Sequence, residues 1–194
     1  MSTRGGIVWI TGLPASGKNT LAAAIGQELA SRSVPFEIID SGKLRETLLG
    51  NTLGFTREER DTNCRRNAFV ASLLARNGVV AIVSSVSPFR STRDSLREEM
   101  DGFVEVWVST PKEVCVDWDP KGLWAKALAG EIRQFTGVDD PYEPPLSPEV
   151  EADLSQEKPA EAAARVLRVL EERGSIKLHP PEAEPVPEGF VTSS

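Results

Sequence analysis

A glycine-rich segment near the start of the chain constrains its fold more than any other feature. It begins as an apolar run at residues 7–10, continues as Gly-Leu-Pro-Ala-Ser-Gly-Lys at residues 12–18, and passes into an alanine-rich stretch that ends at Ala30. The apolar run predicts a buried strand, and the alanine-rich stretch predicts a helix. A strand, a glycine loop of this spacing and a helix are the context of a phosphate-binding loop.

This loop supplies the donors that nucleotide phosphates need. Gly12 and Gly17 let the backbone turn tightly, so that its N–H groups and the positive end of the helix face an anion. Lys18 is placed to reach the β and γ phosphates, which makes it a catalytic candidate. The alternative is a glycine-rich turn without a ligand. We expect ATP to be bound by Gly12, Leu13, Pro14, Ala15, Ser16, Gly17, Lys18, Asn19 and Thr20.

Asn19 departs from the phosphate-loop pattern. The residue after the lysine is ordinarily Ser or Thr, whose hydroxyl binds Mg²⁺. The amide oxygen of Asn19 is an unusual ligand for a hard cation, and Thr20 lies about 100° further round the helix. Asn19 is therefore the candidate metal ligand, ATP and Mg²⁺ are the expected cofactors, and the way the metal is held stays open.

Charge and cysteine usage narrow the classes of function. The chain has 194 residues, enough for one domain with a core, and its 22 basic and 29 acidic side chains give a formal charge of −7. This balance argues against nonspecific binding of nucleic acid. Cys64 and Cys115 are far apart in the sequence, which favours a reducing cytoplasm over a disulfide scaffold. We expect small-molecule nucleotide partners, no nucleic acid and no membrane. The only histidine, His179, leaves no basis for histidine catalysis.

Apolar runs alternate with helical patterns along the first 178 residues, which predicts an α/β fold of the P-loop nucleoside-triphosphate-hydrolase type with a mainly parallel sheet in three layers. Ligands then lie beyond the carboxyl ends of the strands. The expected strands are 7–10, 36–39, 79–83, 103–108 and an edge strand at 176–178. The expected helices are 21–30, 41–49 capped by Ser41, 57–76 capped by Thr56, 91–100, 111–115 and 159–173.

The remaining segments set the expected domain organisation. Residues 1–178 form one kinase domain, within which the stretch from about 117 to 148 has few apolar runs and much Gly and Pro. A segment of that kind inside a compact domain is typical of a functional lid. Residues 179–194 are rich in proline and glutamate and predict a disordered tail.

Three further clusters carry polar chemistry. Residues 55–66 combine Phe55, which can stack on a base, with charged side chains that would otherwise form a solvated helix face. Residues 84–90 place hydroxyls and Arg90 directly after a strand, where they suit phosphate contacts or helix caps. Residues 119–143 read Asp-Pro-Lys-Gly-Leu-Trp-Ala-Lys-Ala and then Gly-Glu-Ile-Arg-Gln-Phe-Thr-Gly-Val-Asp-Asp-Pro-Tyr-Glu, a lid motif or a plain surface loop.

In this order the clusters resemble the adenylyl-sulfate kinase (APS kinase) family over residues 5–175. That family reads Phe-Ile-Ser-Pro-Tyr-Arg, Asp-Pro-Lys-Gly-Leu-Tyr-Lys-Lys-Ala and Gly-Glu-Ile-x-x-Phe-Thr-Gly-Ile-Asp-x-Pro-Tyr-Glu. The resemblance implies transfer of the ATP γ-phosphoryl group to the 3′-hydroxyl of adenosine 5′-phosphosulfate (APS). The product is 3′-phosphoadenosine 5′-phosphosulfate.

The resemblance also implies roles for individual residues. Phe55 and Phe135 would sandwich the adenine of APS, while Arg45, Arg60 and Asn63 would hold its phosphosulfate and ribose. Lys121 and Leu123 would contact APS from the lid. Ser87 corresponds to a serine proposed as a phosphoserine intermediate, which in-line transfer does not require. The implied substrate site is completed by Ser87, Pro88, Arg90 and Thr136.

Departures from the family lie in the phosphoryl-transfer half. Asp40-Ser41-Gly42-Lys43 stands where the family has Asp-Gly-Asp-Asn, and Trp118 replaces the arginine before Asp-Pro-Lys-Gly. Asp40 remains as a catalytic candidate beside Lys18 and Ser87. Three hypotheses follow: an active APS kinase, an impaired nucleotide-binding regulatory paralogue, or a kinase for another nucleotide-linked acceptor. A homodimer is the assembly considered.

Overall fold

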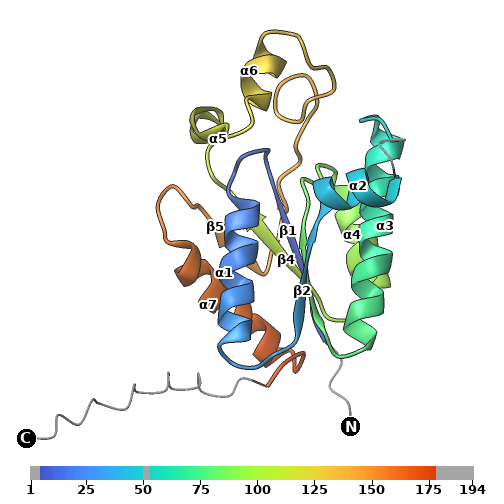
Figure 1. The fold of residues 1–194 in the computed structure, drawn as a ribbon, viewed down its shortest axis with the longest axis vertical. Coiled ribbons are helices and arrows are strands. Elements are labelled where there is room, and N and C mark those ends of the chain that lie inside the picture. Colours follow the sequence, from blue (N-terminus) through green and yellow to red (C-terminus); the bar gives the residue numbers. More distant parts are fainter. Residues whose placement is uncertain (1–4, 50–52, 178–194) are drawn as a thin grey trace, which may run out of the picture.

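The computed structural model describes residues 5–49 and 53–177, and these residues form a five-stranded parallel sheet in the order β2-β3-β1-β4-β5 (Figure 1). Every neighbouring pair of strands is parallel, as the alternation of strands and helices predicts. The strands are β1 (Ile7–Gly12), β2 (Phe36–Asp40), β3 (Val80–Ser84), β4 (Phe103–Val108) and β5 (Val150–Ala152).

Helices cover both faces of the sheet and complete the expected three layers. Helices α1 and α7 lie against one face, and α3 and α4 lie against the other (Figure 1). The buried side chains of β1 alternate between two apolar clusters, with Val8 and Ile10 on the α1 side and Ile7 and Trp9 on the α3 side. The helices are α1 (Lys18–Ala30), α2 (Ser41–Leu49), α3 (Arg57–Arg76), α4 (Arg90–Glu99), α5 (Lys112–Trp118), α6 (Leu123–Leu128) and α7 (Pro159–Glu172).

The register of the strands brings three chain segments to one edge of the sheet. Ile10 of β1 pairs with Ser84 of β3, and Ser84 in turn pairs with Asp40 of β2. The loop after β1, the start of α2 and the loop after β3 therefore emerge side by side. Helices α5 and α6 lie above the same edge (Figure 1), so a ligand site at the carboxyl ends has walls from the sheet and from residues 112–136.

The starts of two helices test the predicted caps. Thr56 caps α3 as predicted, and it forms a reciprocal capping box with Glu59. The cap predicted for α2 is wrong. Asp40, not Ser41, accepts hydrogen bonds at Oδ1 from the backbone N–H groups of Gly42 (2.9 Å) and Lys43 (3.1 Å). Ser41 already lies in the first turn, where its own hydroxyl cannot reach those groups.

Several boundaries differ from the expectations. Helix α1 begins at Lys18 rather than at residue 21, because the phosphate loop itself leads directly into the first turn. Strand β5 and helix α6 are not predicted, since both are too short to show a period. Ile176 and Lys177 belong to no strand, and Leu178, together with the predicted tail at 179–194, lies outside the described residues.

The segment expected to form a lid has a small apolar cluster of its own. Trp124 and Ala127 of α6 pack with Cys115 of α5 and with Phe135, separately from the two clusters that flank the sheet. Nothing tests whether residues 117–148 move as a lid, so that role stays a prediction. Among the residues that the structure describes, no helix is long and apolar enough to cross a membrane.

Candidate nucleotide-binding cavity

A cavity of about 840 Å³ lies at the carboxyl edge of the sheet, beneath α5, α6 and the chain that follows them. Its size suits a nucleotide-sized ligand. Most of the residues predicted for the site are brought together here. The predicted residues that line the cavity are Pro14, Ala15, Gly17, Lys18, Asn19, Thr20, Asp40, Arg45, Phe55, Arg60, Asn63, Ser87, Pro88, Lys121, Leu123, Phe135 and Thr136.

Four predicted residues are not among the lining residues: Gly12, Leu13, Ser16 and Arg90. The first three belong to the phosphate loop, in which Gly12 and Ser16 are buried and Leu13 is partly buried. The guanidinium of Arg90 donates from Nε and Nη2 to the carbonyl of Pro144, at 3.1 and 3.0 Å. In this structure Arg90 therefore bonds the start of α4 to the chain at Pro144.

The phosphate loop ends at the uncovered N-terminus of α1. Gly17 adopts a left-handed conformation (φ 97°) as the N-cap, and no side chain caps the helix. The first N–H groups of α1 are therefore free to bind an anion. The buried hydroxyl of Ser16 also has no hydrogen-bond partner among the described residues. These features are those of a phosphate cradle.

Lys18 is only 9% exposed and folds back on the loop. Its Nζ donates to the carbonyls of Leu13 (2.6 Å) and Gly12 (3.2 Å). Burial lowers the pKa of Lys18 from 10.5 to about 8, and the nearby charges of Cys115 and Asp40 only partly oppose this effect. Because desolvation penalises the charged ammonium, an anion placed beside Lys18 would stabilise it.

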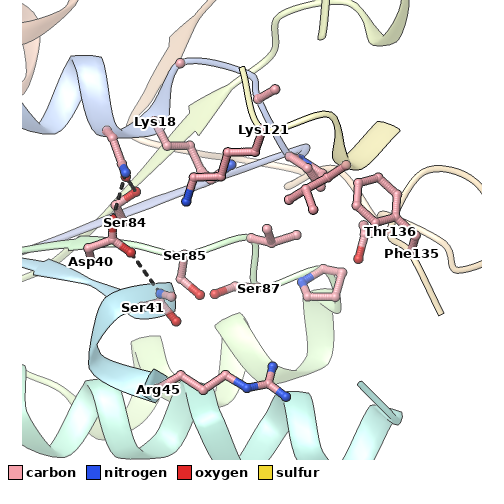
Figure 2. A pocket seen from close by; sticks show the side chains of 18 of the residues that line it. Lys18, Asp40, Ser41, Arg45, Ser84, Ser85, Ser87, Lys121, Phe135 and Thr136 are labelled. Atoms are coloured by element: carbon pink, nitrogen blue, oxygen red, sulfur yellow. Dashed lines mark hydrogen bonds between the residues drawn. The ribbon is translucent and has the colours of Figure 1, made fainter. Parts of the chain in front are cut away.

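Next to Lys18, the side chain of Asn19 joins Asp40 to Ser84, two residues that lie close together (Figure 2). Its Nδ2 donates to Asp40 Oδ2 at 2.8 Å, and its Oδ1 accepts a hydrogen bond from the Ser84 hydroxyl. The amide thus links the ends of β2 and β3 to the first turn of α1. In the same view the side chain of Lys121 extends into the cavity from the lid side.

These oxygens fit a magnesium ion that keeps part of its water shell. The described residues hold no group of three or more His, Cys, Asp or Glu side chains suited to a metal. Mg²⁺ commonly needs only one or two protein oxygens when substrate phosphates and water supply the rest. The carboxylate of Asp40 and the amide oxygen of Asn19 are such a pair. The two oxygens of Asp40 already accept three hydrogen bonds within the protein, and the amide oxygen of Asn19 accepts one.

The opposite end of the cavity combines an aromatic ring with two arginines. Phe55 is 47% exposed, and the guanidinium carbons of Arg45 and Arg60 lie 4.1 and 5.3 Å from its ring centroid. Arg60 Nε also donates to the Phe55 carbonyl at 2.9 Å, and its Nη2 pairs with Asp140 at 3.2 Å. Arg60 thereby connects α3 to the chain that follows α6. Cations and a flat ring suit an anionic nucleotide.

Phe135 and Thr136 form the lid side of this end. The ring of Phe135 meets that of Trp124 edge-on, with centroids 5.0 Å apart, and is 9% exposed. Thr136 is buried, and its hydroxyl has no hydrogen-bond partner among the described residues. A buried, unpaired hydroxyl on a cavity wall indicates a partner supplied by a ligand. Phe55 and Phe135 line one cavity, and whether adenine lies between them stays a prediction.

Ser87 occupies an unusual position on the floor of the cavity. Its φ of 41° is rare for a residue other than glycine. Its hydroxyl accepts hydrogen bonds from the indole N–H of Trp9 (3.1 Å) and from the thiol of Cys64 (3.3 Å), whose pKa is raised by burial. These contacts fix the hydroxyl within the protein, which favours direct in-line transfer over a phosphoserine.

Some lining residues have roles that the sequence did not reveal. Asp119 caps α6 by accepting from the N–H groups of Leu123 (2.8 Å) and Ala125 (3.1 Å), which explains the Asp-Pro-Lys-Gly spacing. Trp118 is 43% exposed and lines the cavity, but one apolar residue at the end of a short helix gives no periodic signal. Cys64 lies on the buried face of α3 with Ala68, Ala71 and Ala75, a helical spacing that could have identified it.

Comparison with known proteins agrees with this geometry. A family model described as Adenylylsulphate kinase matches residues 4–153. The adenylyl-sulfate kinase of Rippkaea orientalis is 47% identical over 176 residues, which cover 91% of this chain and 97% of that protein. The chain is also similar to the solved Mycobacterium tuberculosis APS kinase in complex with AMPPNP and APS (TM-score 0.81, 38% identity, 87% and 98% of the two chains). A third relative is the hexameric APS kinase from Thiobacillus denitrificans (TM-score 0.66, 30% identity, 92% and 31% of the two chains).

Proposed function

The chain belongs to the adenylylsulphate kinase family, and we propose that it transfers the γ-phosphoryl group of ATP to the 3′-hydroxyl of APS. The products are ADP and 3′-phosphoadenosine 5′-phosphosulfate. One observation carries the proposal: a single cavity joins a phosphate loop that contains Lys18 to an end formed by Phe55, Arg60 and Phe135. The first end suits the triphosphate of ATP, and the second suits an anionic adenine nucleotide.

The phosphate end holds and polarises ATP. The free N–H groups of the first turn of α1 bind the phosphates, and Lys18 turns from its carbonyl partners to the β and γ phosphates. Asn19 and Asp40 would hold Mg²⁺, in part through water. A bound metal would supply positive charge that offsets the charge of the phosphates.

The acceptor end holds and orients APS. Phe55 and Phe135 stack on the adenine, and Arg45 and Arg60 pair with the phosphosulfate. Asn63 contacts the ribose, and Lys121 and Leu123 close the site from the lid side. The unpaired hydroxyl of Thr136 supports the presence of a ligand at this wall. Holding both nucleotides in one cavity supplies the proximity that phosphoryl transfer requires.

The reaction forms one bond and breaks another at the γ-phosphorus. The 3′-oxygen of APS attacks in line, the bond between the γ-phosphorus and the β,γ-bridging oxygen breaks, and ADP leaves. Of the described residues that line the cavity, Asp40 and Asp119 are the carboxylates. Asp40 lies at the carboxyl end of β2 and is bonded to Asn19 of the phosphate loop, whereas Asp119 lies at the start of α6. Asp40 is therefore the proposed acceptor for the 3′-hydroxyl proton, directly or through water.

The cellular setting forms part of the proposal. Cys64 and Cys115 are both free and buried, which supports a reducing compartment such as the cytoplasm. The reaction product suits sulfate assimilation. The hexameric relative from Thiobacillus denitrificans supports a homo-oligomer, of which a homodimer is the simplest form.

A direct assay tests the function. The purified chain is incubated with ATP, Mg²⁺ and APS, and nucleotides are separated by ion-exchange chromatography. We expect ADP and 3′-phosphoadenosine 5′-phosphosulfate to form in equal amounts. AMP in place of APS is the control, because it keeps the adenine and ribose but lacks the sulfate. ADP formation that is independent of APS, or none at all, would refute the proposed function.

A further inference from the structure

The cavity loop, which we define as residues 84–90, adopts a conformation that needs external support. Ser87 has a φ of 41°, and such a backbone persists only where its surroundings hold it. Its carbonyl oxygen accepts a hydrogen bond from Arg93 Nη1 at 2.6 Å. The hydroxyl of Thr11 donates to the neighbouring carbonyl of Val86 at 2.7 Å. The position of this wall of the cavity therefore depends on contacts from β1 and α4.

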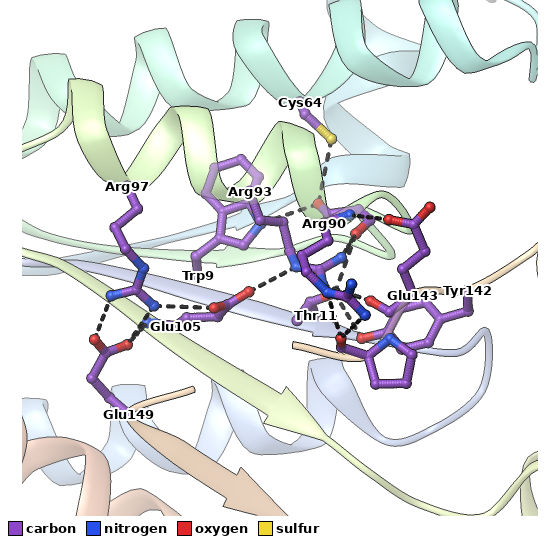
Figure 3. A network of polar contacts seen from close by, with 12 residues as sticks. Trp9, Thr11, Cys64, Arg90, Arg93, Arg97, Glu105, Tyr142, Glu143 and Glu149 are labelled. Carbon is purple, nitrogen blue, oxygen red and sulfur yellow. Dashed lines mark hydrogen bonds and ion pairs between the residues drawn. The ribbon is translucent and has the colours of Figure 1, made fainter. Parts of the chain in front are cut away.

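Arg93 distributes its three guanidinium nitrogens over three separate parts of the chain (Figure 3). Besides the bond to the cavity loop, Nε pairs with Glu105 Oε1 of β4 at 2.7 Å, and Nη2 donates to the carbonyl of Glu143 at 2.6 Å. The residue is 1% exposed. A planar fork of donors can satisfy three partners in this way, whereas the single ammonium of a lysine cannot reproduce the geometry.

The carbonyl of Glu143 belongs to residues 142–144, which we call the return segment. Along this segment the chain runs from Phe135 and Thr136 back to the cavity loop. This segment is bonded to the cavity loop at several points. Glu143 N donates to the Pro88 carbonyl at 2.9 Å, and Arg90 N donates to Glu143 Oε2 at 2.7 Å. The hydroxyls of Tyr142 and Thr11 lie 3.0 Å apart. Arg93 therefore contacts the loop, the return segment and β4 of the sheet together. Thr11 of β1 joins the same two segments through its single hydroxyl.

Arg97, one turn further along α4, provides an internal comparison. It pairs with Glu105 at 3.0 Å and with Glu149, which also accepts from Arg173 at 2.7 Å. Arg97 thus shares the acidic partner of Arg93 and the same helix. Among the described residues, no hydrogen bond or ion pair joins Arg97 to the cavity loop or the return segment. If Arg93 contributed only its ion pair with Glu105, substitutions of Arg93 and of Arg97 should have the same effects.

We propose that Arg93 is a positioning residue for the acceptor: it holds the cavity loop against the return segment, and so sets the spacing between Ser87 and the lid residues Phe135 and Thr136. This role deepens the proposed function and rests on it. The phosphate loop has no bond to Arg93. Loss of the fork should therefore weaken the handling of APS and leave the handling of ATP nearly unchanged.

The test compares Arg93→Lys with Arg97→Lys, two changes that preserve charge on one helix. For Arg93→Lys we expect the KM for APS to rise by about tenfold or more and the KM for ATP to change by less than about threefold. Amide hydrogen exchange without substrate should be faster in peptides that cover residues 84–90 and 139–145. Arg97→Lys should lower the thermal midpoint comparably and leave the KM for APS and both peptides near wild type.

A second variant covers the event that Arg93→Lys does not fold. Glu105→Gln keeps the shape of the partner but weakens the anchor of Arg93, and it should raise the KM for APS by a smaller factor. An unchanged KM for APS and unchanged exchange in the folded Arg93 or Glu105 variant would overturn the proposal. Equal effects from Arg97→Lys would overturn it too. A wild type without APS-dependent turnover refutes the proposed function instead, and the exchange comparison still decides whether Arg93 holds the two segments.

Discussion

The two ends of the cavity are held in different ways. At the acceptor end, arginines bond to distant elements: Arg60 connects α3 to Asp140, and Arg93 connects α4 to β4 and the return segment. At the phosphate end, Asn19 bonds to Asp40 and Ser84, so the two residues proposed to hold Mg²⁺, Asn19 and Asp40, are bonded to each other. The acceptor end is held by bonds to other elements of the fold, whereas the polar side chains of the phosphate end bond to one another.

This difference separates two contributions to phosphoryl transfer. The groups proposed to position APS are present and supported by other elements. The groups expected to neutralise charge are reduced, because Asn19 and Gly42 stand where the family pattern described above has a hydroxyl and a carboxylate. Positioning and charge stabilisation act on different parts of the free-energy barrier. A substitution at one end of the cavity should therefore impair the function of that end and leave the other end nearly unchanged.

Lys18→Met should give the largest effect and be confined to the phosphate end. Loss of the ammonium removes a charged contact to the β and γ phosphates, which should weaken ATP binding by about 1–3 kcal/mol. Titration calorimetry with ATP and with APS measures both ends. Lys18→Arg retains the charge and serves as the control. Unchanged ATP affinity in Lys18→Met would show that the loop is not the ATP site.

Phe55→Ala should produce the matching loss at the acceptor end. The ring is half exposed, so its removal costs little core packing, and lost stacking should weaken APS binding by about 1–3 kcal/mol. Phe135→Leu is a companion that fills most of the space beside Trp124. Thermal unfolding with APS, and with sulfate as the control, reports the binding. The acceptor assignment fails if APS protects wild type no better than sulfate does.

The pH dependence of ATP binding should follow the protonation of Lys18. Because burial lowers the pKa of Lys18 to about 8, the free protein loses this charge above that pH. ATP affinity should fall by up to about tenfold per pH unit between pH 8 and 9.5, while APS affinity falls less. Lys18→Arg, which stays charged, should give a flat profile. A steep wild-type profile shared by that variant would point to another group.

The same shift has the opposite sign for stability. Between about pH 8 and the ordinary lysine pKa of 10.5, the unfolded chain binds the Lys18 proton and the folded chain does not. The contribution of Lys18 to the free energy of unfolding therefore rises with pH across this window. Denaturant titrations of wild type and Lys18→Met at pH 7.5 and 9.5 should show their difference in stability moving in favour of wild type at the higher pH.

Local patterns predicted the parts of the molecule that local forces decide. The phosphate loop, the capping box at Thr56 and the apolar runs of β1, β3 and β4 follow from spacing within a few residues. The contacts of Arg93 do not, because its partners come from residues 87, 105 and 143 and only the fold brings them together. Strand β5 has three residues and gains its pairing from β4 rather than from its own sequence.

The candidate site divides in the same way. Motif resemblance named most of the residues that line the cavity, including Phe55, Arg60 and Phe135. It placed Arg90 in the substrate site, whereas its guanidinium contacts Pro144. The N-cap preference of serine gave Ser41 a capping role that belongs to Asp40, because a side-chain carboxylate one residue earlier reaches the N–H groups of the first turn.

Restoring the family groups at the phosphate end sharpens the comparison. Asn19→Ser frees Asp40 and supplies a hydroxyl, and Gly42→Asp supplies a carboxylate. The φ of Gly42 is not among the positive values, so the backbone accepts the change. The added Cβ would lie 3.2 Å from Asp40 Oδ1, so the Asp40 carboxylate must shift by a few tenths of an ångström. Together they should raise kcat by about tenfold through better charge neutralisation. Asn19→Ala, which breaks the bridge and supplies no oxygen ligand, is the matched control.

Steady-state kinetics of wild type and the Asn19→Ser/Gly42→Asp double variant, with APS affinity measured by calorimetry on the same preparations, tests the separation of the two ends most directly. The account predicts a higher kcat in the double variant with Mg²⁺, and an APS dissociation constant within about twofold of wild type, since the acceptor end is untouched. Equal kcat values with ordinary Mg²⁺ dependence in the wild type, or a gain that appears entirely as tighter APS binding, would contradict it.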